Sequence, residues 1–431
     1  MPDAASGHEV DVLVIGAGPA GIAAACTAAE SGSRVAVIDD NPAAGGQIWR
    51  GGPSASPVTA PVTAPDTTSA WFHRLSRCGA VVHDSTAVID GQGGGGPLML
   101  RTRSPAGVRA WRPRGIVLAT GSRERFLPFP GWTLPGVTGA GGLQALVKQG
   151  LDVRGRRIAI AGTGPLLLAV AELLASKGAL LVVVAEQAPL LRLAGFAAML
   201  CAHPAKLAQA IGIRRAIGPV LRTGTFPVEA RAVDGGLVVT LSSGSPGHER
   251  RQDLACDILA CGFGLVPNVE VARALGCAVR SHGIAVDDYG ATTVRGVWAA
   301  GECTGVGGVD AALVEGRIAG FAAAGRHVDA KPFLAASSRW RRFARSLERT
   351  FALDRRLVRL ATDETIVCRC EDVAAGRLRC HRSWREAKLM TRIGMGPCQG
   401  RVCGPTTEVL FGWSPDDVRP PLQPTPLDEL A

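Results

Sequence analysis

The sequence predicts an α/β protein with two nucleotide-binding domains and a small cysteine-bearing module toward its C-terminal end. Glycine-rich turns at residues 16–21 and 162–167 each follow a short apolar run and precede an alanine- or leucine-rich helical pattern. Near the end of the chain, two close pairs of cysteines lie at residues 368–370 and 398–403. The turns predict two Rossmann-like domains of parallel strands and helices, and the cysteine pairs predict the module.

The turn at residues 16–21 predicts a pyrophosphate site. Gly16 allows the chain to bend sharply, Gly18 lets the backbone approach a pyrophosphate, and Gly21 lets the helix pack closely on the strand. The helix N-terminus directs free N–H groups at the phosphates. The next strand ends at Asp39, eighteen residues after Gly21, where a carboxylate can bind the hydroxyls of an adenosine ribose.

The turn at residues 162–167 departs from this pattern at one position. Gly162 and Gly164 are present, but Leu167 stands where a third small residue is usual, and we expect it to push the helix away from the strand. Glu186 ends the following strand and favours NAD over NADP. Three alternatives stay open here: a working NAD(H) site, a site for another adenine nucleotide, or a vestigial fold.

Composition limits the class of protein. The chain of 431 residues has room for two or three domains, and a hydrophobic content of 47% is that of a globular protein. The net charge of +10 comes mostly from scattered arginines without a nucleic-acid-binding motif, so we expect no nucleic acid partner. We see no secretory signal at the N-terminus and expect a cytoplasmic protein whose cysteines serve metal or redox chemistry.

Residues 339–360 predict a cationic amphipathic helix. Its apolar side chains, Trp340, Phe343, Leu347 and Phe351, recur at helical spacing among arginines. Such a helix can lie on a membrane surface. We expect a linker helix packed on its own protein, so that membrane contact is at most peripheral.

Three further segments resemble the FAD-binding half of the glutathione- and thioredoxin-reductase-like flavoproteins. A Gly-Gly-Gln turn lies at residues 45–47, and a buried strand ends in Ala-Thr-Gly at residues 119–121. Residues 292–302 resemble the second FAD fingerprint, T-x-x-x-x-G-V-[FYW]-A-x-G-D, with Glu302 in place of the aspartate. The resemblance implies that this acid contacts the ribityl chain. The redox cysteine pair of the disulfide reductases is missing from the corresponding stretches.

The C-terminal cysteines predict a metal centre. The C-x-C at residues 368–370 and the C-x-x-x-x-C at residues 398–403 supply four thiols from two tight loops, the number that a [2Fe–2S] cluster needs. Gly394 and Gly400 leave backbone N–H groups that can bond to sulfur. Zinc, or free thiols or a disulfide, stay as alternatives because four cysteines also suit zinc. We expect Cys380 to serve packing rather than metal binding.

Four longer motifs carry a closer resemblance to one group of flavoproteins. The motifs GGQIWR, GECTGVGG, CRCEDV and KLMTRIGMGPCQGRVCGP resemble the FAD subunit of multisubunit amine dehydrogenases, fused to a bacterioferritin-associated-ferredoxin-like (BFD-like) [2Fe–2S] module. These are the alpha (A) subunits of opine oxidases and of D-hydroxyproline or proline dehydrogenases, and the B subunit of hydrogen cyanide synthase. The sarcosine oxidase alpha subunit is a more distant resemblance.

The resemblance spans roughly residues 10–415 and implies a glutathione-reductase-type fold with two dinucleotide-binding domains. It implies FAD and a [2Fe–2S] cluster as cofactors. It further implies a substrate-oxidising FAD beta subunit, similar to glycine or D-amino-acid oxidase, as the partner. A small ferredoxin-like gamma subunit, and FMN at a subunit interface, stay open.

These patterns divide the chain and assign its site residues. We expect the FAD-binding domain at residues 8–150 and 266–330, the inserted NAD-type domain at 151–265, a helical linker at 331–362, the BFD-like module at 363–415 and a tail at 416–431. The residues expected to contact FAD are Gly16, Gly18, Pro19, Ala20, Gly21, Asp39, Asp40, Gly45, Gly46, Gln47, Ala119, Thr120, Gly121, Gly301 and Glu302. Those expected at the second nucleotide are Gly162 and Gly164, and those expected to bind the cluster are Cys368, Cys370, Cys398 and Cys403.

The resulting hypothesis is an electron-transfer alpha subunit of a heteromeric dehydrogenase or oxidase acting on CH–NH donors, of the opine or D-hydroxyproline type. We expect no catalytic residue for substrate oxidation in this chain, because that chemistry would belong to the beta subunit. The first alternative is a stand-alone NAD(P)H-dependent FAD/iron–sulfur reductase. The second is a scaffold or redox sensor that uses its cysteines for regulation.

Overall fold

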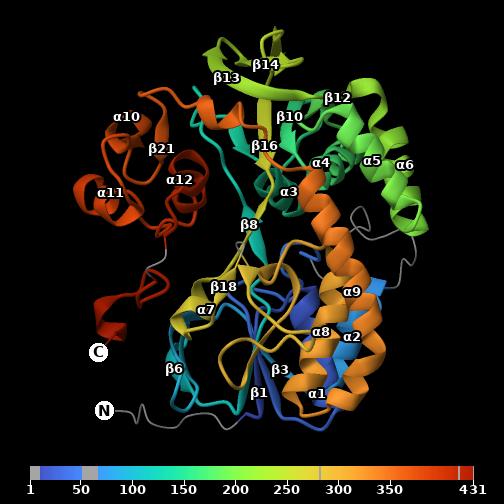
Figure 1. Cartoon of the computed structure of the whole chain (residues 1–431), viewed down its shortest axis with the longest axis vertical. Helices are drawn as coiled ribbons and strands as arrows, with labels where there is room; N and C mark the ends of the chain where they lie inside the picture. Colours follow the sequence, from blue (N-terminus) through green and yellow to red (C-terminus); the bar gives the residue numbers. More distant parts are fainter. Residues whose placement is uncertain (1–9, 51–66, 281–282, 416–417, 431) are drawn as a thin grey trace.

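The computed structural model describes residues 10–50, 67–280, 283–415 and 418–430. The predicted domain start at residues 8–9 and parts of the predicted tail, 416–417 and 431, lie outside these ranges. Figure 1 shows two domains stacked along the long axis of the molecule, with the C-terminal module beside the second domain.

The first domain is built on a five-stranded parallel sheet in the order β20-β7-β1-β2-β3. Its strands are β1 (Val12–Ile15), β2 (Val35–Ile38), β3 (Val81–His83), β7 (Gly115–Leu118) and β20 (Val297–Ala299). The four residues of β1, of β2 and of β7 are all buried, which explains why these strands are continuous apolar runs.

Helices cover one face of this sheet and a small antiparallel sheet covers the other. The helices on the sheet are α1 (Pro19–Glu30), α2 (Thr67–Arg77) and α8 (Val309–Ala323), and α9 (His327–Thr350) packs on α8. The antiparallel sheet consists of β4 (Ala87–Gln92), β5 (Met99–Ser104) and β6 (Gly107–Trp111), and α7 (Glu270–Ala274) packs beside it. Helices α1 and α8 cross closely at Gly316, where a Cβ atom would lie 2.2 Å from the carbonyl oxygen of Ala20.

The second domain repeats the plan with a parallel sheet in the order β12-β11-β10-β16-β9. Its strands are β9 (Val137–Gly139), β10 (Arg157–Thr163), β11 (Leu180–Glu186), β12 (Leu221–Thr223) and β16 (Ile258–Phe263). Its helices are α3 (Ala140–Lys148), α4 (Pro165–Ser176), α5 (Leu190–Leu200) and α6 (Pro204–Ile217), with a 3-10 turn, η3 (Gly218–Val220). An antiparallel sheet of β13 (Thr225–Val233), β14 (Gly236–Ser243) and β15 (Arg250–Cys256) packs on one end. The predicted α/β class with two Rossmann-like domains is confirmed.

Two connections join the domains. Strand β8 (Ser122–Glu124) pairs antiparallel with β17 (Leu265–Pro267) between the two large sheets, and α9 runs alongside both domains (Figure 1). Helix α9 ends at Thr350, ten residues before the expected end at residue 360, and only the 3-10 turn η5 (Leu357–Arg359) follows.

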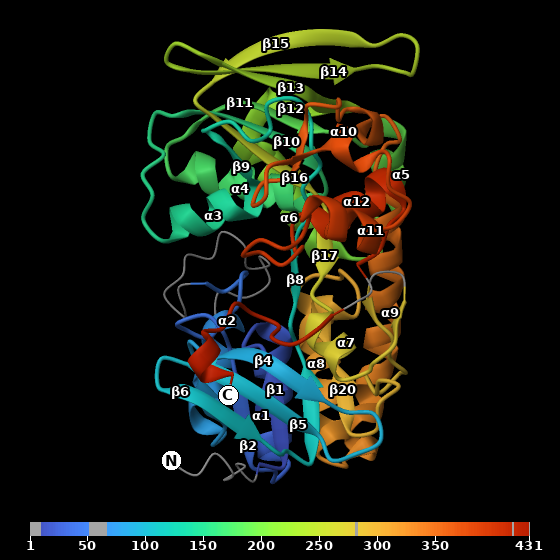
Figure 2. The same ribbon diagram turned by 90° about the vertical axis from the view of Figure 1, so that its left-hand side faces the viewer.

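The C-terminal module is a small helical unit with its own core (Figure 2). It contains β21 (Ile366–Cys368), β22 (Val373–Ala374), α10 (Ala375–Leu378), α11 (Trp384–Thr391) and α12 (Cys403–Phe411). The remaining short elements are β18 (Val279–Arg280), β19 (Gly283–Ile284), η4 (Gly301–Cys303) and η6 (Leu427–Glu429). Among the described residues, no helix is both long and apolar enough to cross a membrane.

Candidate functional site

The first glycine-rich turn is a tight backbone cradle between β1 and α1. Gly16 has a φ of +101°, and a Cβ atom on it would lie 2.3 Å from the carbonyl oxygen of Ala119, so only glycine fits. Gly46 lies against Gly18 across the cradle, because its Cβ would stand 2.9 Å from the Cα of Gly18. The loop at residues 45–47 and the end of β7 thus meet the turn, as the sequence patterns predict.

Asp39 closes this cradle from the end of β2. Its buried carboxylate accepts a hydrogen bond of 2.5 Å from the N–H of Ala17 through Oδ2, while Oδ1 accepts bonds from the backbone and side chain of Asn41. The neighbouring Asp40 carboxyl has its pKa raised by burial and by the charge of Asp39. The Asp39 carboxylate therefore holds the turn in shape at the carboxyl edge of the sheet, which is where dinucleotides bind in such folds.

A second acid lies where the chain returns to the first domain. Glu302 is half-buried in η4, and its Oε2 accepts a 2.5 Å hydrogen bond from the hydroxyl of Ser122. Burial raises the pKa of Glu302. The preceding Gly301 donates its N–H to Glu315 Oε2 of α8, at 2.9 Å. Sequence reasoning missed Ser122, although it directly follows the Ala-Thr-Gly segment, and also missed Glu315.

Strand β8 carries different contacts on its two faces. While Ser122 meets Glu302, the next side chain, Arg123, points toward the C-terminal module. Arg123 donates to Asn268 Oδ1 at 2.6 Å and to the carbonyl oxygen of Arg401 at 3.0 Å, and forms an ion pair with Glu270. Asn268 in turn exchanges hydrogen bonds with Thr120. Residues 120 and 401 are thus joined through two side chains.

The second glycine-rich turn has the same plan with a different packing solution. In the first domain, a Cβ on Gly21 would lie 1.8 Å from the carbonyl oxygen of Gly16 and 3.3 Å from the Cβ of Ala119, which follows β7, so Gly21 allows close packing on both. In the second domain the large residue is on the helix and the glycine is on the strand. Leu167 is buried against Gly262, and a Cβ atom added to Gly262 would lie 3.2 Å from Leu167 Cδ2. Gly262 pairs with Gly162, which places it where Ala119 lies in the first domain. The leucine is therefore accommodated by a missing side chain on β16.

Glu186 at the end of β11 is buried like Asp39. Its Oε2 accepts a bond from the N–H of Gly164 at 2.8 Å, and its Oε1 accepts bonds from the Thr163 hydroxyl and the Ala188 N–H, also at 2.8 Å. Burial raises the pKa of this carboxyl. Both oxygens are therefore used within the domain.

The four expected cluster cysteines surround one cavity of about 220 Å³. The residues that line the cavity are Phe126, Cys368, Arg369, Cys370, Cys398, Val402 and Cys403. Cys380 lies outside this set and is exposed, with its thiol directed to the carbonyl oxygen of Arg377. The structure thus brings the four together and separates the fifth. Cys380 is exposed and does not have the packing role expected for it.

The chemistry of these thiols suits a metal-bound state. A hydrogen bond from Cys403 lowers the pKa of Cys398 to about 4 and that of Cys368 to about 6, and backbone N–H groups of Gly394 and Gly400 bond to Cys368 and Cys398. The same hydrogen bonds raise the pKa of Cys403. A backbone N–H bond lowers the pKa of Cys370, but burial and the neighbouring Cys398 thiol raise it overall. The backbone N–H donors around the thiols are the feature that matches iron–sulfur sites. Within the described part of the chain, no group of three or more His, Cys, Asp or Glu residues already has the arrangement of a metal site. The four cysteines fit a cluster because they are thiols that line one cavity, although their sulfur atoms do not have the arrangement of a metal site.

Comparison with known proteins extends these observations. The family model described as "Pyridine nucleotide-disulphide oxidoreductase" matches residues 10–326. The A subunit of opine oxidase from Rhizobium meliloti (strain 1021) is 33% identical over 98% of this chain and 98% of that protein. The HcnB subunit of hydrogen cyanide synthase from Pseudomonas aeruginosa is 30% identical over 91% of this chain and 90% of that protein.

Solved structures share the fold at low sequence identity. L-proline dehydrogenase from P. horikoshii superposes with a TM-score of 0.65 at 17% identity, covering 98% of this chain and 80% of that chain. Thioredoxin reductase from T. acidophilum superposes with a TM-score of 0.57 at 19% identity, covering 74% of this chain and 99% of that chain. These likenesses confirm the predicted two-domain architecture.

Proposed function

The chain belongs to the pyridine nucleotide-disulphide oxidoreductase family, within the group that contains the opine oxidase A subunits, and from that premise we propose that it is an electron-transfer subunit. It is a flavoprotein oxidoreductase. In the proposal it takes electrons from a separate substrate-oxidising flavoprotein that acts on an amine or imino acid of the opine or D-hydroxyproline type. The names of the relatives, each of which denotes one subunit of an enzyme, support a heteromeric complex.

The observation that carries the proposal is the cavity lined by the four cysteines, in the module beside the second domain. The loop at residues 398–403 also contacts the junction between the two domains through Arg123 of β8, and the same strand carries Ser122 beside Glu302. The candidate flavin site beside Glu302 and the cysteine loop thus contact opposite faces of β8. This arrangement is suited to electron transfer between the two sites. A binding module without redox chemistry would have no need for this arrangement.

The residues that would hold the two groups can be named. In the proposal, FAD lies against the cradle at residues 16–21 and 45–47, with Asp39 at its ribose and Glu302 at its ribityl chain. Helix α8 begins at Val309, shortly after η4, and its N-terminus would face the flavin and stabilise negative charge on it. Cys368, Cys370, Cys398 and Cys403 would hold the [2Fe–2S] cluster. A bound flavin supplies two-electron chemistry and a cluster supplies one-electron chemistry.

The test is the cofactor content of the chain co-expressed with its genomic neighbours. We expect flavin absorption bands together with iron and acid-labile sulfide in the intact complex, and reduction of both centres by the amine substrate. In C398S, iron and sulfide should be lost while the flavin stays. The matched control is C380S, which removes an exposed cysteine outside the cavity and should keep all three.

Three results would overturn the proposal. The first is zinc in place of iron, the second is full amine oxidation by this chain alone, and the third is the absence of any complex with co-expressed neighbours. The stand-alone NAD(P)H reductase makes a different prediction, because NADH would then bleach the flavin without a partner. Glu186 is the observation that favours this second candidate, since an acid at the end of β11 is typical of NAD sites.

A further inference from the structure

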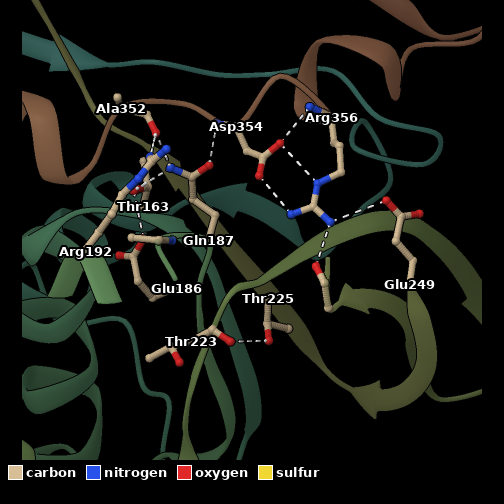
Figure 3. Close-up of polar contacts among 12 residues, drawn as sticks. Thr163, Glu186, Gln187, Arg192, Thr223, Thr225, Glu249, Ala352, Asp354 and Arg356 are labelled. Atoms are coloured by element: carbon tan, nitrogen blue, oxygen red, sulfur yellow. Dashed lines mark hydrogen bonds and ion pairs between the residues drawn. The ribbon is translucent and has the colours of Figure 1, made fainter. Parts of the chain in front are cut away.

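The chain's own linker lies over the second glycine-rich turn. After α9 ends at Thr350, residues 351–354 run past the carboxyl ends of β10 and β11 (Figure 3). Gln187, which follows β11, holds this segment at two points: its Nε2 donates to the carbonyl oxygen of Ala352 at 2.9 Å, and its Oε1 accepts from the N–H of Asp354 at 2.7 Å. The Thr163 hydroxyl lies 3.4 Å from the carbonyl oxygen of Phe351.

Further contacts fix both ends of this segment, which we call the cover segment (residues 351–354). On one side, the ring of Phe351 packs edge-on against Phe196 of α5, with ring centroids 5.5 Å apart. On the other side, Asp354 forms a 2.8 Å ion pair with Arg356. Arg356 also donates to the carbonyl oxygen of Gly244 and stacks over a ring in β13, as Figure 3 shows in part. The cover segment is thus attached to α5 and to the antiparallel sheet on either side of the turn.

The place that the cover segment occupies is the one where a dinucleotide binds in this type of fold. Ligands of open parallel sheets bind outside the carboxyl ends of the strands, with the acid at the end of the second strand on the adenosine ribose. Here Thr163 bonds to both Glu186 and the cover segment, so the segment lies directly above the acid. Among the described residues, the carboxylates of Asp39 and Glu186 both accept bonds only from their own domains. The feature specific to the second site is the cover segment, which Thr163 and Gln187 hold over it.

We propose that the cover segment excludes NAD(H) from the second domain and so determines which electron donor this chain can use. The adenosine half of the dinucleotide and residues 351–354 compete for the same backbone and side-chain groups at the ends of β10 and β11. Electrons then reach the chain from a donor other than NADH, which agrees with a partner flavoprotein. The inference deepens the proposed function, but its test depends only on nucleotide binding.

The test compares NADH and ADP-ribose binding to the full-length flavin-loaded chain and to two opened variants. The first variant replaces residues 351–354 with Gly-Ser-Gly-Ser at unchanged length, and the second, D354A, removes the ion pair that holds one end of the segment. Binding is followed by calorimetry and by the shift in unfolding temperature. We expect no saturable binding to the native chain. Affinity should tighten by roughly tenfold or more in the opened variants, because the native site is available only in the fraction of molecules with the segment displaced.

The matched control is D253A, which removes an exposed ion pair with Arg231 in the antiparallel sheet; neither residue contacts the cover segment or Arg356. It should behave like the native chain. Micromolar binding of NADH to the native chain would overturn the proposal. So would opened variants that fold, keep their flavin and still fail to bind either nucleotide, because another feature would then exclude it. If the native chain contained no iron, or formed no complex with a partner, the proposed function would be contradicted. The inference about nucleotide exclusion would not be affected.

Discussion

Arg123 Nε donates a hydrogen bond of 3.0 Å to the backbone carbonyl oxygen of Arg401, and this contact joins β8 to the cysteine loop. Because the acceptor is a main-chain atom, the contact depends on the path of the loop and not on the side chain at residue 401. The guanidinium also holds Asn268 and Glu270, so it fixes the loop relative to two elements of the first domain.

Replacing Arg123 should loosen this junction. We expect R123Q to lower the free energy of unfolding by about 1.5 kcal/mol, because hydrogen bonds of a charged group are lost at a mostly buried site. It should also slow electron passage from the reduced flavin to the cysteine-bound centre, measured by anaerobic stopped-flow absorption. The control is R114Q, since Arg114 is largely exposed and pairs only loosely with Asp11. Equal electron-transfer rates in R123Q and the native chain would contradict the positioning role.

Leu167 and Gly262 should behave as a coupled pair. L167A leaves a cavity in the core and should cost about 2–4 kcal/mol, while G262A overpacks it and should cost about 1–3 kcal/mol. In the double variant the methyl group added at position 262 enters the space that the leucine leaves, so the total cost should be smaller than the sum. Chemical denaturation of the four proteins measures the coupling, and strict additivity would show that the two side chains do not share a space.

The crossing of α1 and α8 predicts a position-specific effect of alanine. A Cβ atom on Gly316 would overlap the carbonyl oxygen of Ala20, so G316A should force the helices apart and destabilise the protein by more than about 2 kcal/mol, the cost of severe overpacking. G212A in α6 is the matched control, because nothing lies within 4 Å of the corresponding Cβ position. There alanine should stabilise by up to about 1 kcal/mol through its helix propensity. Equal thermal unfolding of the two variants would contradict the close crossing.

Glu315 predicts a pH dependence of stability in the flavin-free chain. Burial raises the pKa of this carboxyl, so the folded state binds a proton more tightly than the unfolded state. The stability from this group is therefore fully present below the unfolded pKa, about 4.3, and is lost as pH rises through the higher folded value.

In E315Q the amide oxygen can still accept the hydrogen bond from Gly301, but the side chain no longer titrates. We expect the variant to gain stability relative to the native chain as pH rises from about 4 to about 8, measured by urea unfolding at each pH. E229Q, at a half-exposed position on β13, is the control. A difference between native chain and E315Q that stays constant with pH would contradict the assignment.

The sequence contained most of the site because its signals are local. The apolar runs that became β1, β2, β7, β10 and β11, and the glycine turns after β1 and β10, depend on neighbouring residues only. Each close pair of cysteines is likewise a local signal, whereas the meeting of the two pairs in one cavity depends on the fold of the module between them. The strands and their glycine turns are determined by short stretches of sequence, so pattern and spacing suffice to predict them.

What the sequence did not predict depends on long-range contacts. Strand β8 reads Ser-Arg-Glu and has no apolar pattern, because β17 and the two domains decide its position. Helix α9 ends at Thr350, ten residues before the end that its sequence pattern predicts. Its apolar periodicity continues through Phe351 and Leu353, but those side chains pack on the second domain and not along the helix. No glycine or proline follows Thr350 closely enough to mark the change.

The alternation of side chains along β8 has a consequence for which kinds of change this segment can accept. Ser122 and Arg123 reach opposite sides only because successive residues of a strand point to opposite faces. Inserting or deleting one residue in β8 would exchange those sides, presenting arginine to Glu302 and serine to the cysteine loop. A substitution in β8 would weaken the contact of one side chain and leave the other in place. A change of length by one residue would break the contacts of both Ser122 and Arg123 at once. The distance along the chain between residues 119 and 124 is therefore as much a part of the site as the side chains it carries.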